Sequence, residues 1–340
     1  MDWYLAAPFI FDSEDRWLTA HVPNDDGRMS FRAVPAAYRH DRSRAGSSLR
    51  DWGDYFRHGA QVWRAARAGR RPSGILTCFP QLPIAVGLRK RAALSRMPLV
   101  AWNFNLGQLY TGARRTLART ALAGVDRFVV HSRSEIAGYS EWLDIDPARF
   151  EFIPLQRATM PITLQEDHER PFVLSMGSAH RDYRLLFGVL KELGLPAVVV
   201  AGPHAFAGLE VPPNVEVRSG LTIDECHALL QRARLSVIPV ANQRTASGQV
   251  TLLDAMVYGR PVVITECPAS VDYVHHQRDA WLVRAGDHDD MKQAIERLWQ
   301  DDTLRERLGH EARRSAVERY SDPAIGSQMG RLLRAVEAAH

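Results

Sequence analysis

One stretch, from residue 235 to residue 265, constrains the fold more than any other part of the chain. It opens with an apolar run rich in β-branched residues, Leu235–Val240, which predicts a buried parallel strand. Apolar side chains then recur at helical spacing through Val250–Tyr258, and a glycine and a proline end that helix. A second strand follows at Pro261–Ile264. The unit is therefore strand, loop, helix, strand, as in a parallel α/β sheet.

The loop before that helix carries a candidate ligand site. It ends in Ser247, Gly248 and Gln249, where the unpaired N–H groups and partial positive charge of a helix start favour an anion. We expect Ser247 to cap the helix and Gly248 to let a ligand approach the backbone closely. Asp254, just under two turns further on, would reach a hydroxyl of a ligand whose phosphates lie at the helix start. An ordinary crossover with a well-capped helix is the alternative.

A second strand-to-helix turn has the same character. The expected strand Phe172–Met176 is followed by Gly177, Ser178 and then Arg181, before a helix at Tyr183–Leu193. A glycine-bearing turn at a helix start is an anion site, and the fork of Arg181 would grip a phosphate with two hydrogen bonds. A surface arginine without a ligand is the alternative.

The second half of the chain resembles a known family of enzymes. LLDAMVYGRPVV at 252–263, ASVDYV at 269–274 and the segment AWLVRAGDHDDMKQAIERL are similar to the nucleotide-sugar-binding half of glycosyltransferases with the GT-B architecture, especially the retaining family 4. The resemblance covers about 150 residues, 172–320. It implies an α/β fold with two Rossmann-like domains facing a cleft. The expected parts are an acceptor-binding domain at 1–155, a linker at 156–170, a nucleotide-sugar-binding domain at 171–320, and a C-terminal helix at 321–340 that crosses back to the first domain.

The resemblance also implies roles for single residues. Arg181 matches a cation that holds the donor diphosphate, Asp254 a carboxylate that binds the donor ribose, and Asp272 a further donor contact. The backbone near Leu221 would cover the base. The family's hexose-binding glutamate falls at Ala246 here, so the donor sugar stays open. The candidate donor-binding residues are Gly177, Ser178, Arg181, Leu221, Arg244, Ser247, Gly248, Gln249, Asp254 and Asp272, of which Arg244 would suit an acidic sugar.

The first half offers three candidates for the catalytic side of the site. Asn103 and Asn105 follow the expected strand Pro98–Trp102, and His131 ends the strand Arg127–His131. Ligand crevices in open α/β sheets lie outside the carboxyl ends of the strands, and amides suit sugar hydroxyls. Turn asparagines explain the same pattern without a ligand. Ser132, with a glutamate three residues on, predicts a capping box for the next helix.

The charge is spread unevenly along the chain. Residues 1–165 hold 23 Arg/Lys against 15 Asp/Glu, whereas the remainder holds 20 against 24. Residues 55–125 contain twelve Arg/Lys and no Asp or Glu. Such a segment should attract an anionic surface, either acidic phospholipid, a lipid-linked pyrophosphate or nucleic acid. A general preference for arginine at solvated positions is the alternative.

The expected function is transfer of a sugar from a UDP- or GDP-linked donor to an acceptor hydroxyl, with a lipid-linked or surface-polysaccharide acceptor. The resemblance implies a retaining mechanism without an enzyme nucleophile. The two turns would stabilise the leaving diphosphate without a metal, since the acidic pair Asp144 and Asp146 follows a helix, and no cofactor is expected. A nucleotide-sugar 2-epimerase on the same fold and a non-catalytic nucleic-acid-binding protein are the alternatives.

The remaining expectations concern location. The three cysteines, Cys78, Cys226 and Cys267, lack disulfide or metal spacing, which suits a reducing compartment. No apolar run is long enough for a transmembrane helix, and the first residues do not form a signal peptide. We therefore expect a cytoplasmic protein, peripheral at the inner membrane face through residues 55–125, with no nucleic acid as partner.

Overall fold

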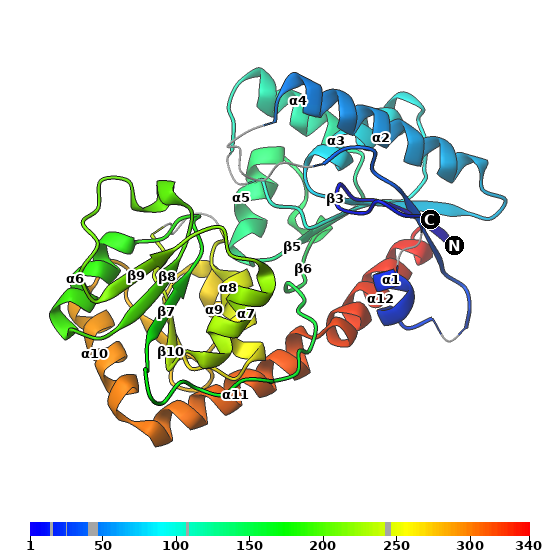
Figure 1. Cartoon of the computed structure of the whole chain (residues 1–340). Helices are drawn as coiled ribbons and strands as arrows, with labels where there is room; N and C mark the ends of the chain where they lie inside the picture. Colours follow the sequence, from blue (N-terminus) through cyan, green and yellow to red (C-terminus); the bar gives the residue numbers. More distant parts are fainter. Residues whose placement is uncertain (14–15, 25, 40–46, 107–108, 242–245) are drawn as a thin grey trace. The chain divides into compact units, whose positions relative to one another are not determined.

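The computed structural model describes residues 1–340 except 14–15, 25, 40–46, 107–108 and 242–245. The chain divides into two compact units. Unit 1 comprises Met1–Pro154 together with Ile325–His340, and unit 2 comprises Leu155–Ala324. Each unit contains a six-stranded sheet with helices on both faces, which confirms the predicted α/β class with two Rossmann-like domains (Figure 1).

Unit 1 is built on a parallel sheet with the strand order β2-β1-β3-β4-β5-β6. Its strands are β1 (Asp2–Ala6), β2 (Ser30–Val34), β3 (Ser73–Cys78), β4 (Leu99–Trp102), β5 (Arg127–Val130) and β6 (Phe150–Phe152). Its helices are α1 (Arg16–His21), α2 (Leu49–Ala68), α3 (Gln81–Ala92), α4 (Ala113–Leu122), α5 (Ser134–Leu143), the short η1 (Pro147–Arg149) and the larger part of α12 (Asp322–Ala338).

Unit 2 is also built on a parallel sheet, in the order β12-β11-β10-β7-β8-β9. Its strands are β7 (Val173–Met176), β8 (Ala197–Val200), β9 (Val215–Arg218), β10 (Leu235–Ile238), β11 (Val262–Thr265) and β12 (Trp281–Val283). Its helices are α6 (Tyr183–Leu193), η2 (Pro203–Phe206), α7 (Ile223–Arg232), α8 (Gln249–Val257), α9 (Pro268–Val271), α10 (His288–Gln300) and α11 (Asp302–Tyr320).

The two faces of the sheet in unit 1 are covered by helices from different parts of the chain. Helices α2, α3, α4 and α5 bury one apolar cluster, which includes Tyr55, Leu82 and Phe128. Helices α1 and α12 bury the other, which includes Leu18 and Met329 (Figure 1). The C-terminal helix is therefore a structural part of the first sheet's core.

The strand order of unit 2 places a topological switch point between β7 and β10. The chain runs outward from β7 through β8 to β9, and then from β10 through β11 to β12 on the other side. Helices α6 and α10 pack on one face of the sheet, and α7 and α8 lie on the other (Figure 1). Ligands of open α/β sheets bind where such an order reverses, outside the carboxyl ends of the strands. In unit 2 this edge is formed by the turns after β7 and β10.

The predicted capping box of Ser132 and Glu135 is wrong. Helix α5 is preceded by Arg133 in a helical backbone conformation, and Arg133 makes no side-chain cap. Ser132 Oγ instead bonds to Ser134 Oγ at 2.8 Å, and Glu135 is buried and accepts from the Tyr139 hydroxyl at 2.9 Å. A capping residue has an extended backbone, whereas Arg133, the residue directly before α5, is helical.

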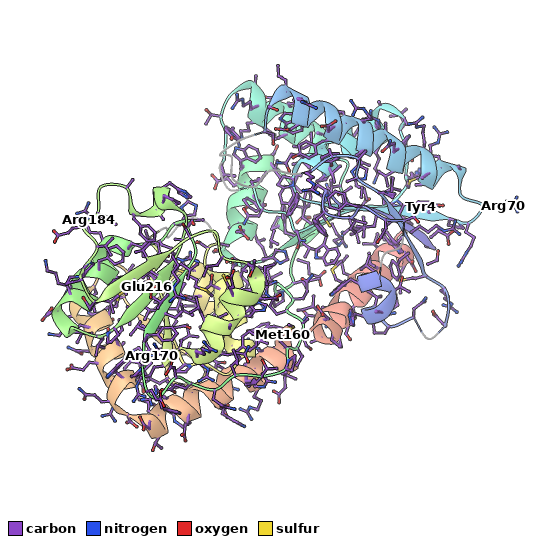
Figure 2. All side chains as sticks on the ribbon, viewed as in Figure 1. Tyr4, Arg70, Met160, Arg170, Arg184 and Glu216 are labelled. Atoms are coloured by element: carbon purple, nitrogen blue, oxygen red, sulfur yellow. The ribbon has the colours of Figure 1, made fainter. Side chains whose placement is uncertain are left out.

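Among the described residues, no helix meets the length and apolarity that crossing a membrane requires. Side chains fill the space between helices and sheet in both units, whereas Arg70 and Arg184 extend into solvent (Figure 2).

Candidate functional site

The turns after β7 and β10 lie against each other in unit 2. The N–H group of Asp182 donates to the carbonyl of Pro239 at 2.9 Å, and the N–H group of Ala241 donates to the backbone carbonyl of His180 at 3.0 Å. Arg181 pairs with Val240 as an isolated antiparallel bridge. The Val240 N–H also donates to Thr265 Oγ1 at 2.9 Å, which ties the end of β10 to the end of β11. The structure thus brings both sequence-predicted turns to the switch point of the sheet.

Arg181 is the side chain that joins the two turns. Its Nη1 donates to the carbonyl of Ala179 at 2.8 Å and to Ser247 Oγ at 3.2 Å. Its Nη2 donates to Thr251 Oγ1 at 3.3 Å, and its Nε donates to the backbone carbonyl of Met176 at 3.3 Å. These contacts use four of the five N–H groups of the guanidinium. Arg181 therefore holds the turns in place, and one N–H remains for an anion rather than the two-pronged grip that the sequence predicts.

Burial of the Arg181 guanidinium lowers its pKa, because removal from water disfavours the charged form. Even so, an arginine stays protonated at any physiological pH. Gly177 lies directly beneath it, and a side chain on Gly177 would meet Nη2 at 2.7 Å. Ser178 is also hydrogen-bonded within the protein, since its Oγ accepts from the N–H group of Gly202 at 2.8 Å. The turn after β7 is thus a rigid frame that combines a fixed positive charge with close backbone.

The start of α8 differs from the prediction. The residue that caps the helix is Gly248, which has no side chain to offer, and Ser247 does not cap it. Ser247 Oγ donates instead to the Ala179 carbonyl at 3.3 Å. Gly248 has a φ of 89°, which only glycine adopts without strain. Ser247 therefore does not cap the first N–H groups of α8, where the partial positive charge of the helix favours an anion.

Asp254 lies on the second turn of α8, as predicted, but it has a partner that the sequence did not suggest. Arg157 Nη2 donates to Asp254 Oδ2 at 3.2 Å, and Arg157 Nε lies 2.6 Å from Oδ1. Leu221 and Asp272 are half-buried and follow β9 and α9, respectively. Arg244 lies outside the described residues.

In unit 1 the structure brings two of the three predicted residues together. Asn103 Oδ1 lies 2.6 Å from His131 Nε2, and His131 Nδ1 lies 2.7 Å from the carbonyl of Ile153. Burial lowers the pKa of His131 to about 4, so the ring is neutral at pH 7. A neutral ring has one N–H, so with Nδ1–H on Ile153 the Asn103 amide must turn its NH₂ group to Nε2. Asn105 lies two residues beyond, with an exposed side chain.

A cavity of about 360 Å³ in unit 1 lies elsewhere. It is lined by Ala123, Asp126, Arg127, Arg149, Val336, Ala339 and His340. Arg127 begins β5 and Arg149 precedes β6, so this cavity is at the amino ends of those strands, away from Asn103 and His131. In the part of the chain that the structure describes, no three His, Cys, Asp or Glu side chains are grouped to hold a metal ion.

Sequence reasoning missed three residues that shape the unit 2 site. Thr251, Thr265 and Arg157 all act through contacts with residues far along the chain. Thr251 lies on the helix predicted at 250–258, one helical turn after Gly248. Helical spacing alone could therefore have shown that its side chain points toward the loop after β7. Arg157 and Thr265 have no local signal.

Comparison with known proteins shows which proteins the chain is similar to. Residues 190–301 match the family model "Glycosyl transferases group 1". The chain is 26% identical over 199 residues to the MMP alpha-(1->4)-mannosyltransferase of Mycolicibacterium hassiacum, which is 54% of this chain and 48% of that protein. It is 26% identical over 95 residues to the capsular polysaccharide biosynthesis glycosyltransferase CapM of Staphylococcus aureus, covering 28% and 25% of the two chains. The chain thus spans half the length or less of the curated relatives it matches.

Among solved structures, Anabaena Alr3699/HepE in complex with UDP superimposes with a TM-score of 0.69. The superposition covers 98% of this chain and 99% of that chain at 13% sequence identity, so it speaks for the fold. The prediction of a GT-B fold is confirmed. The chain is similar to the group 1 glycosyl transferases over residues 190–301, and it has the two parallel six-stranded sheets of the GT-B fold, one in each unit.

Proposed function

We propose that the chain transfers a sugar from a nucleoside-diphosphate donor to an acceptor hydroxyl, and that unit 2 binds the donor. The observation that carries this is the meeting of two anion-favouring turns at the switch point, joined by Arg181. UDP is named in the solved complex of Alr3699/HepE, which makes it the first nucleotide to test.

The donor diphosphate is proposed to lie between Gly177 and the start of α8. There it meets the backbone N–H groups of the helix, the positive end of the helix dipole and the remaining N–H of Arg181. These groups are fixed before the ligand arrives, so they stabilise negative charge on the departing diphosphate without reorganising. Asp254 would accept hydrogen bonds from the ribose, and the backbone at Leu221 would cover the base.

The reaction is proposed to retain the configuration of the sugar. The bond from the anomeric carbon to the diphosphate oxygen breaks, the acceptor oxygen bonds to the same face, and the acceptor proton passes to the departing diphosphate. No enzyme nucleophile is used, and the fixed positive groups of unit 2 need no metal to do this work. Asn103 and Asn105 are proposed to bind the sugar or acceptor hydroxyls, because an amide both donates and accepts, and His131 is proposed to hold Asn103 in one orientation.

A thermal-shift screen against UDP, GDP, ADP and their sugars tests this proposal. A stabilising shift with one of them, reduced in Asp254→Asn and in Gly248→Val, is the expected result, because a ligand that binds only the folded state raises its melting temperature. The matched control is Arg297→Gln at the far end of α10, which breaks an ion pair with Asp301 away from both turns. No shift with any nucleotide, beside salt-sensitive binding to RNA or DNA, would overturn the proposal.

The acceptor is proposed to be lipid-linked or a surface saccharide, with unit 1 lying against an anionic membrane. Helices α2, α3 and α4 lie on one face of the unit 1 sheet and carry most of the basic residues of the acid-free segment 55–125. The exposed side chains of this segment include Arg64, Arg67 and Arg114, and Leu94, which follows α3, is 91% exposed. A cationic face with exposed leucine is suited to acidic phospholipid.

Sedimentation with vesicles tests the membrane proposal. Binding to phosphatidylglycerol vesicles but not to phosphatidylcholine vesicles is expected, and it should weaken in the double variant Arg67→Glu and Arg70→Glu. The control carries Arg170→Glu and Arg184→Glu, two exposed arginines of unit 2 (Figure 2). Equal loss in both double variants, or no binding by the unaltered protein, would contradict the proposal.

A further inference from the structure

Arg157 stands where the chain passes from unit 1 to unit 2. Unit 2 begins at Leu155, and the chain returns to unit 1 after Ala324. The backbone N–H of Arg157 donates to the carbonyl of Tyr320 at 2.8 Å, and Tyr320 is the last residue of α11. The two crossing segments of the chain are therefore hydrogen-bonded to each other within unit 2.

Tyr273 completes this junction. Its hydroxyl accepts from the N–H group of Leu155 at 3.0 Å, and its carbonyl accepts from the Tyr320 hydroxyl. The rings of Tyr273 and Tyr320 lie 5.3 Å apart, and both side chains are fully buried. We call Leu155, Arg157, Tyr273 and Tyr320 the crossing clamp. It fixes the backbone from which the Arg157 side chain extends.

The other end of Arg157 is fixed by Asp254. One aligned hydrogen bond joins Nη2 to Oδ2, and Nε stands 2.6 Å from Oδ1. The Asp254 side chain is only 17% exposed, so its charge needs a nearby cation. Burial raises the pKa of Cys226 and of Tyr258, and the Asp254 carboxylate raises both further. Arg157 is thus the cation beside the Asp254 carboxylate, and it controls the orientation of that group.

We propose that Arg157 is a positioning residue for the ribose of the nucleotide donor. The inference rests on the proposed role of Asp254 in binding that ribose. A carboxylate offers about four lone-pair directions, and Arg157 occupies those on one side. The remaining directions stay open for the two hydroxyls of a ribose, held at a fixed angle because Arg157 is anchored at both ends. Without Arg157 the carboxylate would rotate, and both hydroxyl contacts would weaken.

Titration calorimetry with UDP and with 2′,3′-dideoxy-UDP tests this inference, or the corresponding GDP pair if the thermal-shift screen selects guanine. Arg157→Gln should weaken binding of the nucleotide with hydroxyls about tenfold, the size of one hydrogen bond to a charged group. It should change binding of the dideoxy nucleotide less than about twofold. Arg157→Lys, which keeps the charge without the fork, should fall between the two proteins. A purely structural role would weaken both nucleotides equally.

Two further variants separate the possible failures. Asp254→Asn should abolish the preference for the nucleotide with hydroxyls, whereas Arg297→Gln should leave both affinities unchanged. If Asp254→Asn keeps the preference, the proposed ribose contact is wrong and the inference falls with it. If Asp254→Asn loses the preference while Arg157→Gln keeps it, the ribose contact stands and the positioning role of Arg157 is overturned.

Discussion

At the scale of single residues, burial decides which candidate groups can carry charge or a proton. His131 is enclosed in unit 1, with Nδ1 on the carbonyl of Ile153 and Nε2 at Asn103. Its depressed pKa means that it cannot act as a cationic acid near pH 7. The neutral His131 ring is suited to hold the Asn103 amide in one orientation. Asn103 is therefore a better candidate than His131 for contact with a substrate hydroxyl.

The enclosed His131 makes stability depend on pH. Its pKa is about 4 in the folded protein and 6.5 when exposed, so the unfolded chain binds more protons between these values. Stability from this group is complete above pH 6.5 and is lost as the pH falls toward 4, at up to about 1.4 kcal/mol per pH unit. Urea denaturation of the unaltered protein and of His131→Gln at a series of pH values measures this loss of stability. The difference in stability between them should shrink as the pH falls, and a constant difference would contradict the burial of a neutral ring.

The sequence predicted correctly which residues form the turns of the unit 2 site. It did not predict which atoms their side chains contact. Glycine, serine and arginine after an expected strand pointed to the correct turn, because short-range rules govern such turns. Which atoms those side chains contact depends on partners elsewhere in the chain. Arg181 was expected to face a phosphate, and the structure gives most of its donors to Ala179, Ser247, Thr251 and Met176.

At the scale of helices and strands, α8 links the core of unit 2 to its candidate site. Its start faces the switch point, and its end is fixed by α11, where Arg313 Nη1 donates to the carbonyl of Val257. Gly309 of α11 touches the chain just after α8, so that a side chain there would come 2.2 Å from the carbonyl oxygen of Gly259. The close approach of these two segments sets the position of α8.

Gly309→Ala should therefore destabilise the protein by about 3 kcal/mol or more, because the carbonyl it meets is backbone that cannot turn aside. The matched control is Gly188→Ala in α6, where the nearest atom to the new carbon, on His288, is 3.8 Å away. There a helical alanine should stabilise by about 0.5–1 kcal/mol. Chemical denaturation of both variants gives the comparison. Equal stability of the two would contradict the close crossing of α8 and α11.

Most elements could be predicted because apolar periodicity reports burial directly. The helix at Tyr183–Leu193 has the predicted bounds. Caps were less predictable, because a cap depends on the backbone angles of one residue. Ser132 and Ser247, the two expected caps, do not cap their helices, whereas Thr222 forms a capping box with Glu225 at the start of α7. The strand order, and with it the switch point, has no local signal.

At the scale of the whole molecule, the chain combines a basic unit 1 with a unit 2 whose sheet order creates one anion-favouring edge. The fold is shared with solved structures of the GT-B architecture, and the geometry of the two turns supports the proposal that a donor diphosphate lies there. The central claim is that nucleotide binding happens at this edge of unit 2.

Hydrogen–deuterium exchange with and without a saturating nucleotide, the one selected by the thermal-shift screen, tests that claim most directly. Backbone N–H groups that bond to a diphosphate exchange more slowly, and local exchange reports such protection segment by segment. The account predicts slower exchange in peptides that span Gly177–Asp182 and Gly248–Leu252, with little change in peptides from residues 55–125. Protection confined to residues 55–125, or none at either turn while the nucleotide is bound, would contradict it.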